Sequence, residues 1–105
     1  MIEMIDLAQI KQWVQSQNLR LAERGIRVVG TSETERHKPS VCIDYEGEEA
    51  IGRILIWTSG EIDMEVLDRE SETFRYLHHI TIEDLQASPL ADAVQEFARS
   101  MESKE

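Results

Sequence analysis

The chain has 105 residues, which predicts a single domain over residues 1–105, with one hydrophobic core and no need of a metal or a disulfide. Its 21 acidic residues outnumber its 11 basic residues, and the resulting net charge of -10 argues against direct binding to nucleic acid, which requires a basic surface. We also expect no membrane span, because no stretch approaches the roughly 20 apolar residues that cross a bilayer, and no export signal, because no basic segment precedes an apolar run at the start.

The first predicted element is a helix that begins near Leu7. Asp6 is a suitable N-cap, and Gln9 follows three residues later, in the spacing of a capping box. Apolar residues then recur with a helical period until Gly25, which is a natural C-terminal stop. The apolar face consists of Leu7, Ile10, Val14 and Leu21, with Trp13 beside it. We expect this face to pack on a sheet.

From Ile26 the period of the apolar residues changes from helical to alternating. This alternation predicts two strands, one over residues 26–30 and one over residues 41–46. The polar segment between them, residues 31–40, predicts an exposed connection, because it contains charged residues and ends in a proline-containing turn.

A hairpin is predicted next, between strands over residues 51–57 and 62–67. Gly60 lies in the short turn between them and can adopt the left-handed conformation that such a turn needs. A further strand over residues 73–80 follows a polar turn. Together these segments predict an antiparallel β-meander of four or five strands.

The end of the chain returns to a helical pattern. Thr81 is expected to cap a first turn with Asp84 in capping-box spacing, and Ser88-Pro89 marks a second helix start. The apolar stripe of this helix consists of Leu90, Val94, Phe97 and Met101. The fold class is therefore α+β, a meander flanked by an N-terminal and a C-terminal helix, with both helices on the apolar face of the sheet.

Acidic residues are concentrated in the middle of the chain. Residues 44–72 contain ten of them against only Arg53 and Arg69, so this stretch carries -8 of the net charge. Alternation places Asp44 and Glu46 opposite the apolar residues of one strand, and Asp63 and Glu65 opposite those of another. If both strands turn the same way, the four carboxylates share the solvent face of the sheet. Three interpretations stay open: a solvated face that hinders edge pairing, an electrostatic recognition surface, and a metal or acid/base site.

The residue types that usually carry catalysis do not form a motif here. A metal-dependent nuclease motif would place a lysine two residues after Glu65, where the sequence has Leu67. His78 and His79 are adjacent in a predicted strand and point to opposite sides, so they cannot share a metal ion. Cys42 is the one cysteine, which excludes an intramolecular disulfide and fits a reducing compartment. We predict no enzymatic activity, no cofactor and no metal, and a cytoplasmic location.

The two tryptophans are expected in the core, as large aromatic residues usually are. Alternation nevertheless places Trp57 on the same face as Leu55 and opposite Ile54 and Ile56. The alternative for Trp57 is therefore an interface anchor surrounded by carboxylates.

The middle of the chain combines turn residues, one tryptophan and alternating acids in a characteristic order. In sequence these are Lys38-Pro39-Ser40, Asp44, Ile51-Gly52-Arg53-Ile54, Trp57, Ser59-Gly60-Glu61, Asp63 and Glu65-Val66-Leu67-Asp68. The combination resembles the TriTu family of bacterial immunity proteins, covers roughly the central third of the chain and contains no catalytic signature.

The resemblance implies a small cytoplasmic protein that neutralises a toxin of a contact-dependent growth-inhibition system. It implies as partner a tRNA-cleaving nuclease domain, in a larger complex with elongation factor Tu. An acidic surface could occlude the active site or the basic RNA-binding groove of such a toxin. The resemblance transfers no contact residues, so the residue pattern alone assigns partner binding to Asp44, Glu46, Trp57, Glu61, Asp63 and Glu65. The alternative functions are an acidic adaptor or regulatory subunit for another cytoplasmic protein and, third, a small metal-dependent hydrolase.

Overall fold

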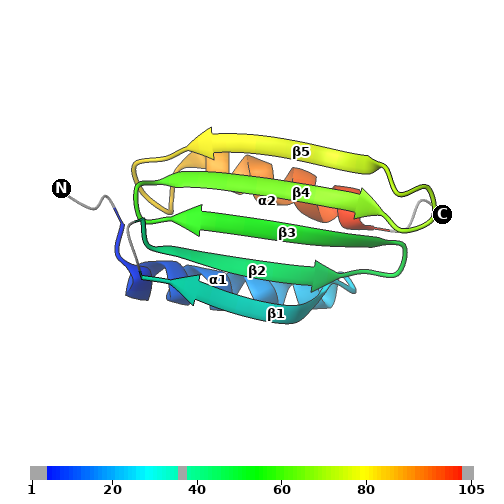
Figure 1. Ribbon diagram of the computed structural model, residues 1–105, viewed down its shortest axis with the longest axis horizontal. Coiled ribbons are helices and arrows are strands. Elements are labelled where there is room, and N and C mark those ends of the chain that lie inside the picture. Colours follow the sequence, from blue (N-terminus) through cyan, green and yellow to red (C-terminus); the bar gives the residue numbers. More distant parts are fainter. Residues whose placement is uncertain (1–4, 36–37, 103–105) are drawn as a thin grey trace.

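The computed structural model describes residues 5–35 and 38–102 (Figure 1). Residues 1–4, where we expect no export signal, and residues 36–37 of the predicted connection lie outside the described residues. The elements in chain order are α1 (Leu7–Glu23), β1 (Arg27–Thr34), β2 (Ser40–Glu46), β3 (Ala50–Trp57), β4 (Glu61–Asp68), β5 (Phe74–Thr81) and α2 (Ser88–Met101).

The strands form one sheet in the order β1-β2-β3-β4-β5, with every neighbouring pair antiparallel. The predicted meander is confirmed and has five strands. Both helices lie on the same face of this sheet, as Figure 1 shows, with α1 against β1 and β2 and α2 against β3, β4 and β5. The α+β class and the placement of the helices are therefore as predicted.

The hydrophobic core fills the space between the sheet and the two helices. Its largest contributions come from alternate residues of the three central strands, each 2% exposed or less, and from the inner faces of the helices. The strand residues are Val41, Ile43, Tyr45, Ile54, Ile56, Ile62, Met64 and Val66, and the helix residues include Ile10, Val14, Leu21, Leu90, Phe97 and Met101. The apolar residues that alternate along the strands and those that recur with a helical period along the helices thus pack together in one core layer.

The first helix begins and ends as its sequence signals predict. The Gln9 backbone N–H donates to Asp6 Oδ1 over 2.8 Å, and the Asp6 N–H donates to Gln9 Oε1 over 3.1 Å, which completes the capping box. After the last turn, Gly25 adopts a φ of +80°, the left-handed conformation of a helix stop.

The second helix packs closely on the centre of the sheet. A Cβ atom at Gly52 of β3 would lie 2.7 Å from both Met101 Sδ and Phe97 Cζ, so glycine is what allows this approach. The Phe97 ring also packs edge-on against the Tyr45 ring, with centroids 5.5 Å apart. These contacts fix α2 against β2 and β3.

A side-chain clasp joins the β4–β5 turn to the end of α2. The Arg75 guanidinium donates to Asp68 Oδ2 over 2.8 Å and to the carbonyl oxygens of Ser100 and Glu102 over 3.0 and 3.1 Å. The Asp68 carboxylate also accepts the Ser71 backbone N–H, and this bond together with Arg75 holds the pKa of Asp68 well below its usual value. The carboxylate therefore stays ionised where it anchors the arginine.

Two predictions of local structure are wrong. The segment Thr31–Thr34, predicted as a connection, extends β1 and pairs with Ser40–Ile43, because sheet pairing satisfies the backbone of a polar edge strand. Thr81 ends β5 instead of capping a helix, and the next backbone N–H, of Ile82, donates to Gly60 O over 2.9 Å. This bond holds the chain on the hairpin turn, so the helix begins only at Ser88, with proline in its first turn as predicted.

No helix among the described residues is both long enough and apolar enough to cross a membrane.

Candidate partner-binding face

The sheet face opposite the helices, which we call the open face, is covered by no other described element (Figure 1). Its side chains form rows across the strands, because residues that pair between neighbouring strands point the same way. From β2 to β5 the three central rows are Cys42, Leu55, Asp63 and His79, then Asp44, Arg53, Glu65 and Leu77, then Glu46, Ile51, Leu67 and Phe74.

The six residues assigned to partner binding all lie on the open face or at its edge. Asp44 and Glu46 come from β2, Trp57 ends β3, and the other three, Glu61, Asp63 and Glu65, alternate along β4. The prediction that the carboxylates of both strands share one face is therefore confirmed. Their role in binding stays a prediction.

Along the sequence the acidic stretch contains only Arg53 and Arg69 as opposite charges, but in the fold opposite charges are not scarce on this face. All of these carboxylates except that of Glu65 pair with a basic or histidine side chain. The pairs are Asp44 with Arg53, Glu46 with both Arg27 and Arg69, Glu61 with Lys38, and Asp63 with His79. Arg27 and Lys38 lie outside the acidic stretch of the sequence, so a count along the chain overstated the charge of the folded surface.

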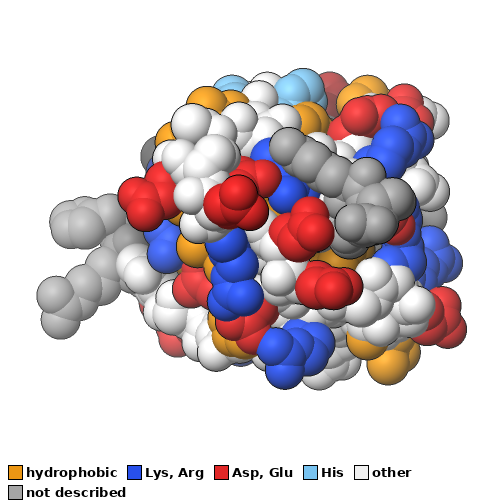
Figure 2. Space-filling view, turned by 90° about the vertical axis from the view of Figure 1, so that its right-hand side faces the viewer, with side chains coloured by type: hydrophobic (Ala, Val, Ile, Leu, Met, Phe, Trp, Pro, Cys, Tyr) orange, Lys and Arg blue, Asp and Glu red, His pale blue; other side chains and the backbone are white. Residues whose placement is uncertain are grey.

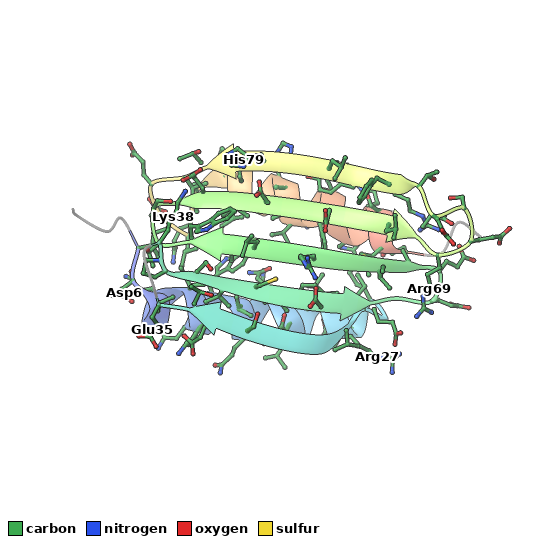
Figure 3. All side chains as sticks on the ribbon, viewed as in Figure 1. Asp6, Arg27, Glu35, Lys38, Arg69 and His79 are labelled. Atoms are coloured by element: carbon green, nitrogen blue, oxygen red, sulfur yellow. The ribbon has the colours of Figure 1, made fainter. Side chains whose placement is uncertain are left out.

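The lysine and arginine side chains are unevenly distributed over the open face. Figure 3 shows Lys38 at one end of the strands and Arg27 and Arg69 near the other. At the centre, Arg53 Nε donates to Asp44 Oδ1 over 2.8 Å, and this bond raises the pKa of the guanidinium. Glu65 forms no hydrogen bond or ion pair with any residue that the structure describes.

Two groups near the Lys38 end have pKa values shifted from the usual ones. The Lys38 ammonium and the Ser59 hydroxyl, the latter at 3.0 Å, donate to the Glu61 carboxylate and hold its pKa below the usual value. Cys42 is half-buried beside Leu55, and this burial raises the pKa of its thiol. Glu61 is therefore ionised near neutral pH, while the thiol stays protonated.

The core interpretation is confirmed for Trp13 and wrong for Trp57. Trp13 packs partly buried against the core. Trp57 lies half-buried on the open face, with Lys38 Nζ 5.0 Å from its ring centroid, a cation–π contact. The face therefore carries an aromatic side chain beside its carboxylates, as in the interface-anchor alternative.

Three exposed apolar side chains also lie on the open face, and the sequence analysis did not assign them to the site. Ile51, Phe74 and Leu77 are 40%, 53% and 62% exposed. Alternation from His79 could have placed Leu77 on this face. It could not have placed Phe74, because a bulge at Arg75 shifts the register so that Phe74 pairs with Leu67.

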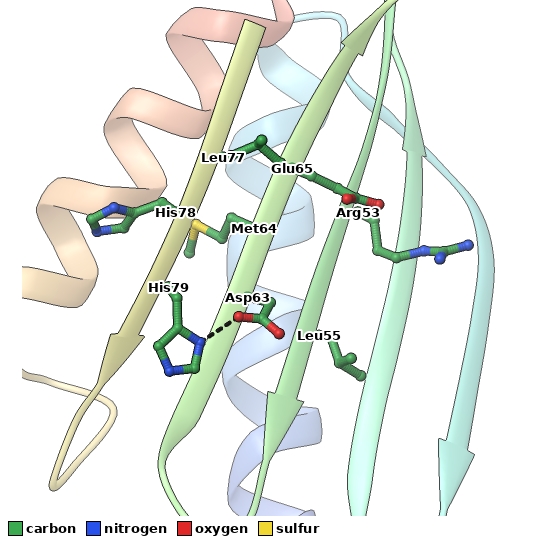
Figure 4. A pocket seen from close by; sticks show the side chains of 8 residues that line it. All are labelled: Arg53, Leu55, Asp63, Met64, Glu65, Leu77, His78 and His79. Atoms are coloured by element: carbon green, nitrogen blue, oxygen red, sulfur yellow. Dashed lines mark hydrogen bonds and ion pairs between the residues drawn. The ribbon is translucent and has the colours of Figure 1, made fainter. Parts of the chain in front are cut away.

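A shallow hollow of about 520 Å³ lies over β3, β4 and β5. Figure 4 shows its lining, in which leucines of β3 and β5 lie on either side of two carboxylates of β4. The lining residues are Arg53, Leu55, Asp63, Met64, Glu65, Leu77, His78 and His79. As predicted, the two adjacent histidines diverge: His79 pairs with Asp63 on the open face, whereas His78 lies across from Met64, an inward-facing residue.

The end of the sheet near the β2–β3 and β4–β5 turns carries the remaining acidic residues of the middle stretch. Figure 2 shows acidic and basic side chains mixed over this end. A second hollow, of about 660 Å³, is lined here by Glu48, Glu49, Asp68, Arg69, Glu70, Ser71 and Arg75. No described group of three or more histidine, cysteine or acidic side chains, at this end or elsewhere, is arranged to hold a metal ion.

Comparison with known proteins gives one family. No curated protein matches the chain. The family model described as "Immunity protein TriTu" matches residues 8–99, which include all five strands and most of both helices, well beyond the central motifs that suggested the resemblance. The chain therefore belongs to the TriTu family of immunity proteins.

Proposed function

We propose that this protein binds a cognate toxin through the open face and thereby neutralises it. The toxin is a tRNA-cleaving nuclease domain of a contact-dependent growth-inhibition system, and binding occludes its active site or its RNA-binding groove. Inhibition takes place in the cytoplasm, by contact and not by catalysis, and without direct contact to nucleic acid or membrane. The toxin can be bound within a larger complex that includes elongation factor Tu.

The observation that carries this proposal is the mixture of side chains on the open face. Protein interfaces bury aromatic and aliphatic anchors within a rim of polar and charged groups. Ile51, Phe74 and Leu77 expose apolar surface here, next to the half-buried Trp57. Because both helices occupy the opposite face, the open face is the side of the sheet left for a partner.

Electrostatics supports a basic partner. A nuclease that handles tRNA needs a cationic groove, and a protein of net charge -10 attracts such a surface from a distance. At short range the partner must compete with the protein's own arginines and lysines for the carboxylates. Charge therefore sets mainly the encounter rate, and the apolar anchors set the lifetime of the complex. The residues proposed to contact the toxin are Asp44, Glu46, Trp57, Glu61, Asp63 and Glu65, together with the exposed apolar residues.

The first test is co-purification with the C-terminal region of the protein encoded by the adjacent upstream gene, followed by a tRNA-cleavage assay with and without the immunity protein. We expect a stable complex, suppressed cleavage, and an association rate that falls as salt rises. If there is neither a complex nor suppression, this toxin is not the partner and the adaptor alternative takes its place.

The second test maps the surface. Charge reversal to lysine at Asp44, Glu46, Asp63 and Glu65 is expected to abolish protection while the circular-dichroism spectrum stays that of a folded protein. The matched control reverses four exposed acids away from the centre of the open face, and these are Glu23, Glu48, Glu70 and Glu83. Both variants have the same net charge, so a difference between them reports position. Full protection by the folded open-face variant would refute binding through this face.

A further inference from the structure

The hollow over β3, β4 and β5 combines apolar walls with a carboxylate between them. Leu77 lies directly across from Glu65 in the β4–β5 pairing, and Leu55 lies across from Asp63 in the β3–β4 pairing. Paired side chains on one face have Cβ atoms about 5 Å apart, so each carboxylate borders a leucine. Figure 4 shows both leucines beside the two acids. The hollow is therefore amphipathic, with hydrocarbon at its sides and negative charge between.

The charges around the hollow are satisfied unequally. The Arg53 guanidinium extends away from the hollow in Figure 4 and donates to Asp44 on β2. Asp63 pairs with His79. Glu65 alone among the carboxylates of the hollow lacks an ion pair with a described residue, although it is only partly exposed and borders Leu77. Arg53 lies across from Glu65 and interacts with it electrostatically, but its hydrogen bond goes to Asp44. A carboxylate in such a setting can accept hydrogen bonds from a partner's cation without first breaking an ion pair of its own.

An arginine side chain matches this hollow best. Its aliphatic stem can lie against Leu55 and Leu77, which would cover the large exposed surface of Leu77. Its planar guanidinium can bind the Glu65 carboxylate through two parallel hydrogen bonds, a geometry that a lysine ammonium cannot reproduce. Arginine is also enriched among the residues that dominate binding energy at interfaces.

We propose that this hollow receives one arginine side chain of the toxin, with Glu65 as its counter-charge and the two leucines as its walls. The inference rests on the proposed function, because it names the contact at the centre of the same face. It makes Glu65 a determinant of partner choice: a toxin without an arginine at this position leaves the carboxylate unpaired in a desolvated interface.

The experiment measures the dissociation constant of the complex with the toxin domain from the adjacent upstream gene. Glu65→Gln keeps the shape of the side chain and removes its charge, and Glu70→Gln removes one charge from an exposed turn as the matched control. We expect Glu65→Gln to raise the dissociation constant at least about tenfold and Glu70→Gln to change it less than about threefold. Thermal melts of the free variants establish that both are folded.

A double-mutant cycle identifies the partner side chain. Each arginine of the toxin domain is changed to alanine, and one of these changes should weaken binding to the wild-type protein while having little further effect on Glu65→Gln. Unchanged binding of Glu65→Gln, while the wild-type complex forms, would overturn this inference and leave the proposed function standing. Failure of the wild-type complex would overturn the proposed function itself. Coupling of Glu65 to a toxin lysine instead would overturn the assignment to arginine.

Discussion

Replacing each of two phenylalanines, one on either side of the sheet, shows which side contributes more to the stability of the fold. Phe97 of α2 is 0% exposed, whereas Phe74 of β5 is 53% exposed on the open face. Phe97→Ala removes a fully buried ring, ends its edge-on contact with Tyr45 and leaves a cavity, so we expect a loss of about 3–5 kcal/mol in the free energy of unfolding. Phe74→Ala leaves no cavity and removes a ring that is half in water, so its cost should be about 1 kcal/mol or less.

The assay is urea unfolding followed by circular dichroism, together with thermal melts. A protein of this size has about 5–15 kcal/mol of stability, so Phe97→Ala should lower the melting temperature on the order of 20 °C. Phe74→Ala should melt within a few degrees of the wild type and yet weaken toxin binding. Equal losses of stability in the two variants would refute the assignment of one packed and one open face.

Three further predictions concern the turns. Gly60→Ala should cost about 2–4 kcal/mol, measured by urea unfolding, because its φ is +95° and a Cβ would lie 2.2 Å from the Ile82 carbonyl oxygen. Glu72→Gly should instead raise the free energy of unfolding by about 0.5–1 kcal/mol in the same assay, because Glu72 has a φ of 59° that glycine adopts without strain. A lower free energy of unfolding in this variant would contradict the prediction. The lowered pKa of Asp68 stabilises the fold above the unfolded value of about 3.9, and this contribution is lost as pH falls below it. Asp68→Asn should therefore show a weaker fall in stability between about pH 5 and pH 2 than the wild type.

Much of the fold could be predicted because its signals are local. The capping box at Asp6, the stop at Gly25 and the turn at Gly60 each depend on a few consecutive residues, and the structure has all three. The predictions of secondary structure were wrong where pairing with a strand distant in the sequence decides whether a segment joins the sheet. Thr31–Thr34 is a strand because β2 offers it a pairing edge, and Thr81 stays in the sheet because it pairs with Glu61.

The position of the candidate site on the sheet could be predicted from the sequence, but the net charge of its surface could not. Alternation within each strand placed its carboxylates opposite its buried residues, and a shared face followed once both strands were taken to turn the same way. Their neutralisation by Arg27 and Lys38 depends on contacts between residues 19 and 23 positions apart in the chain, which no local pattern reveals. The exposure of Phe74 depends on a bulge at Arg75, which is itself held by Asp68 and the end of α2.

If the open face binds the toxin as proposed, one face of the sheet stabilises the fold and the other recognises the partner. Core side chains between the sheet and the helices each account for several kcal/mol, whereas an exposed ion pair of the kind found on the open face is worth about 0–1 kcal/mol. The open face can therefore change its charges and anchors at little cost to the fold. Once a partner covers this face, the same groups are desolvated and a mispaired carboxylate becomes expensive. Discrimination between toxins is thus expected to come from groups such as Glu65, which contribute little to the stability of the free protein.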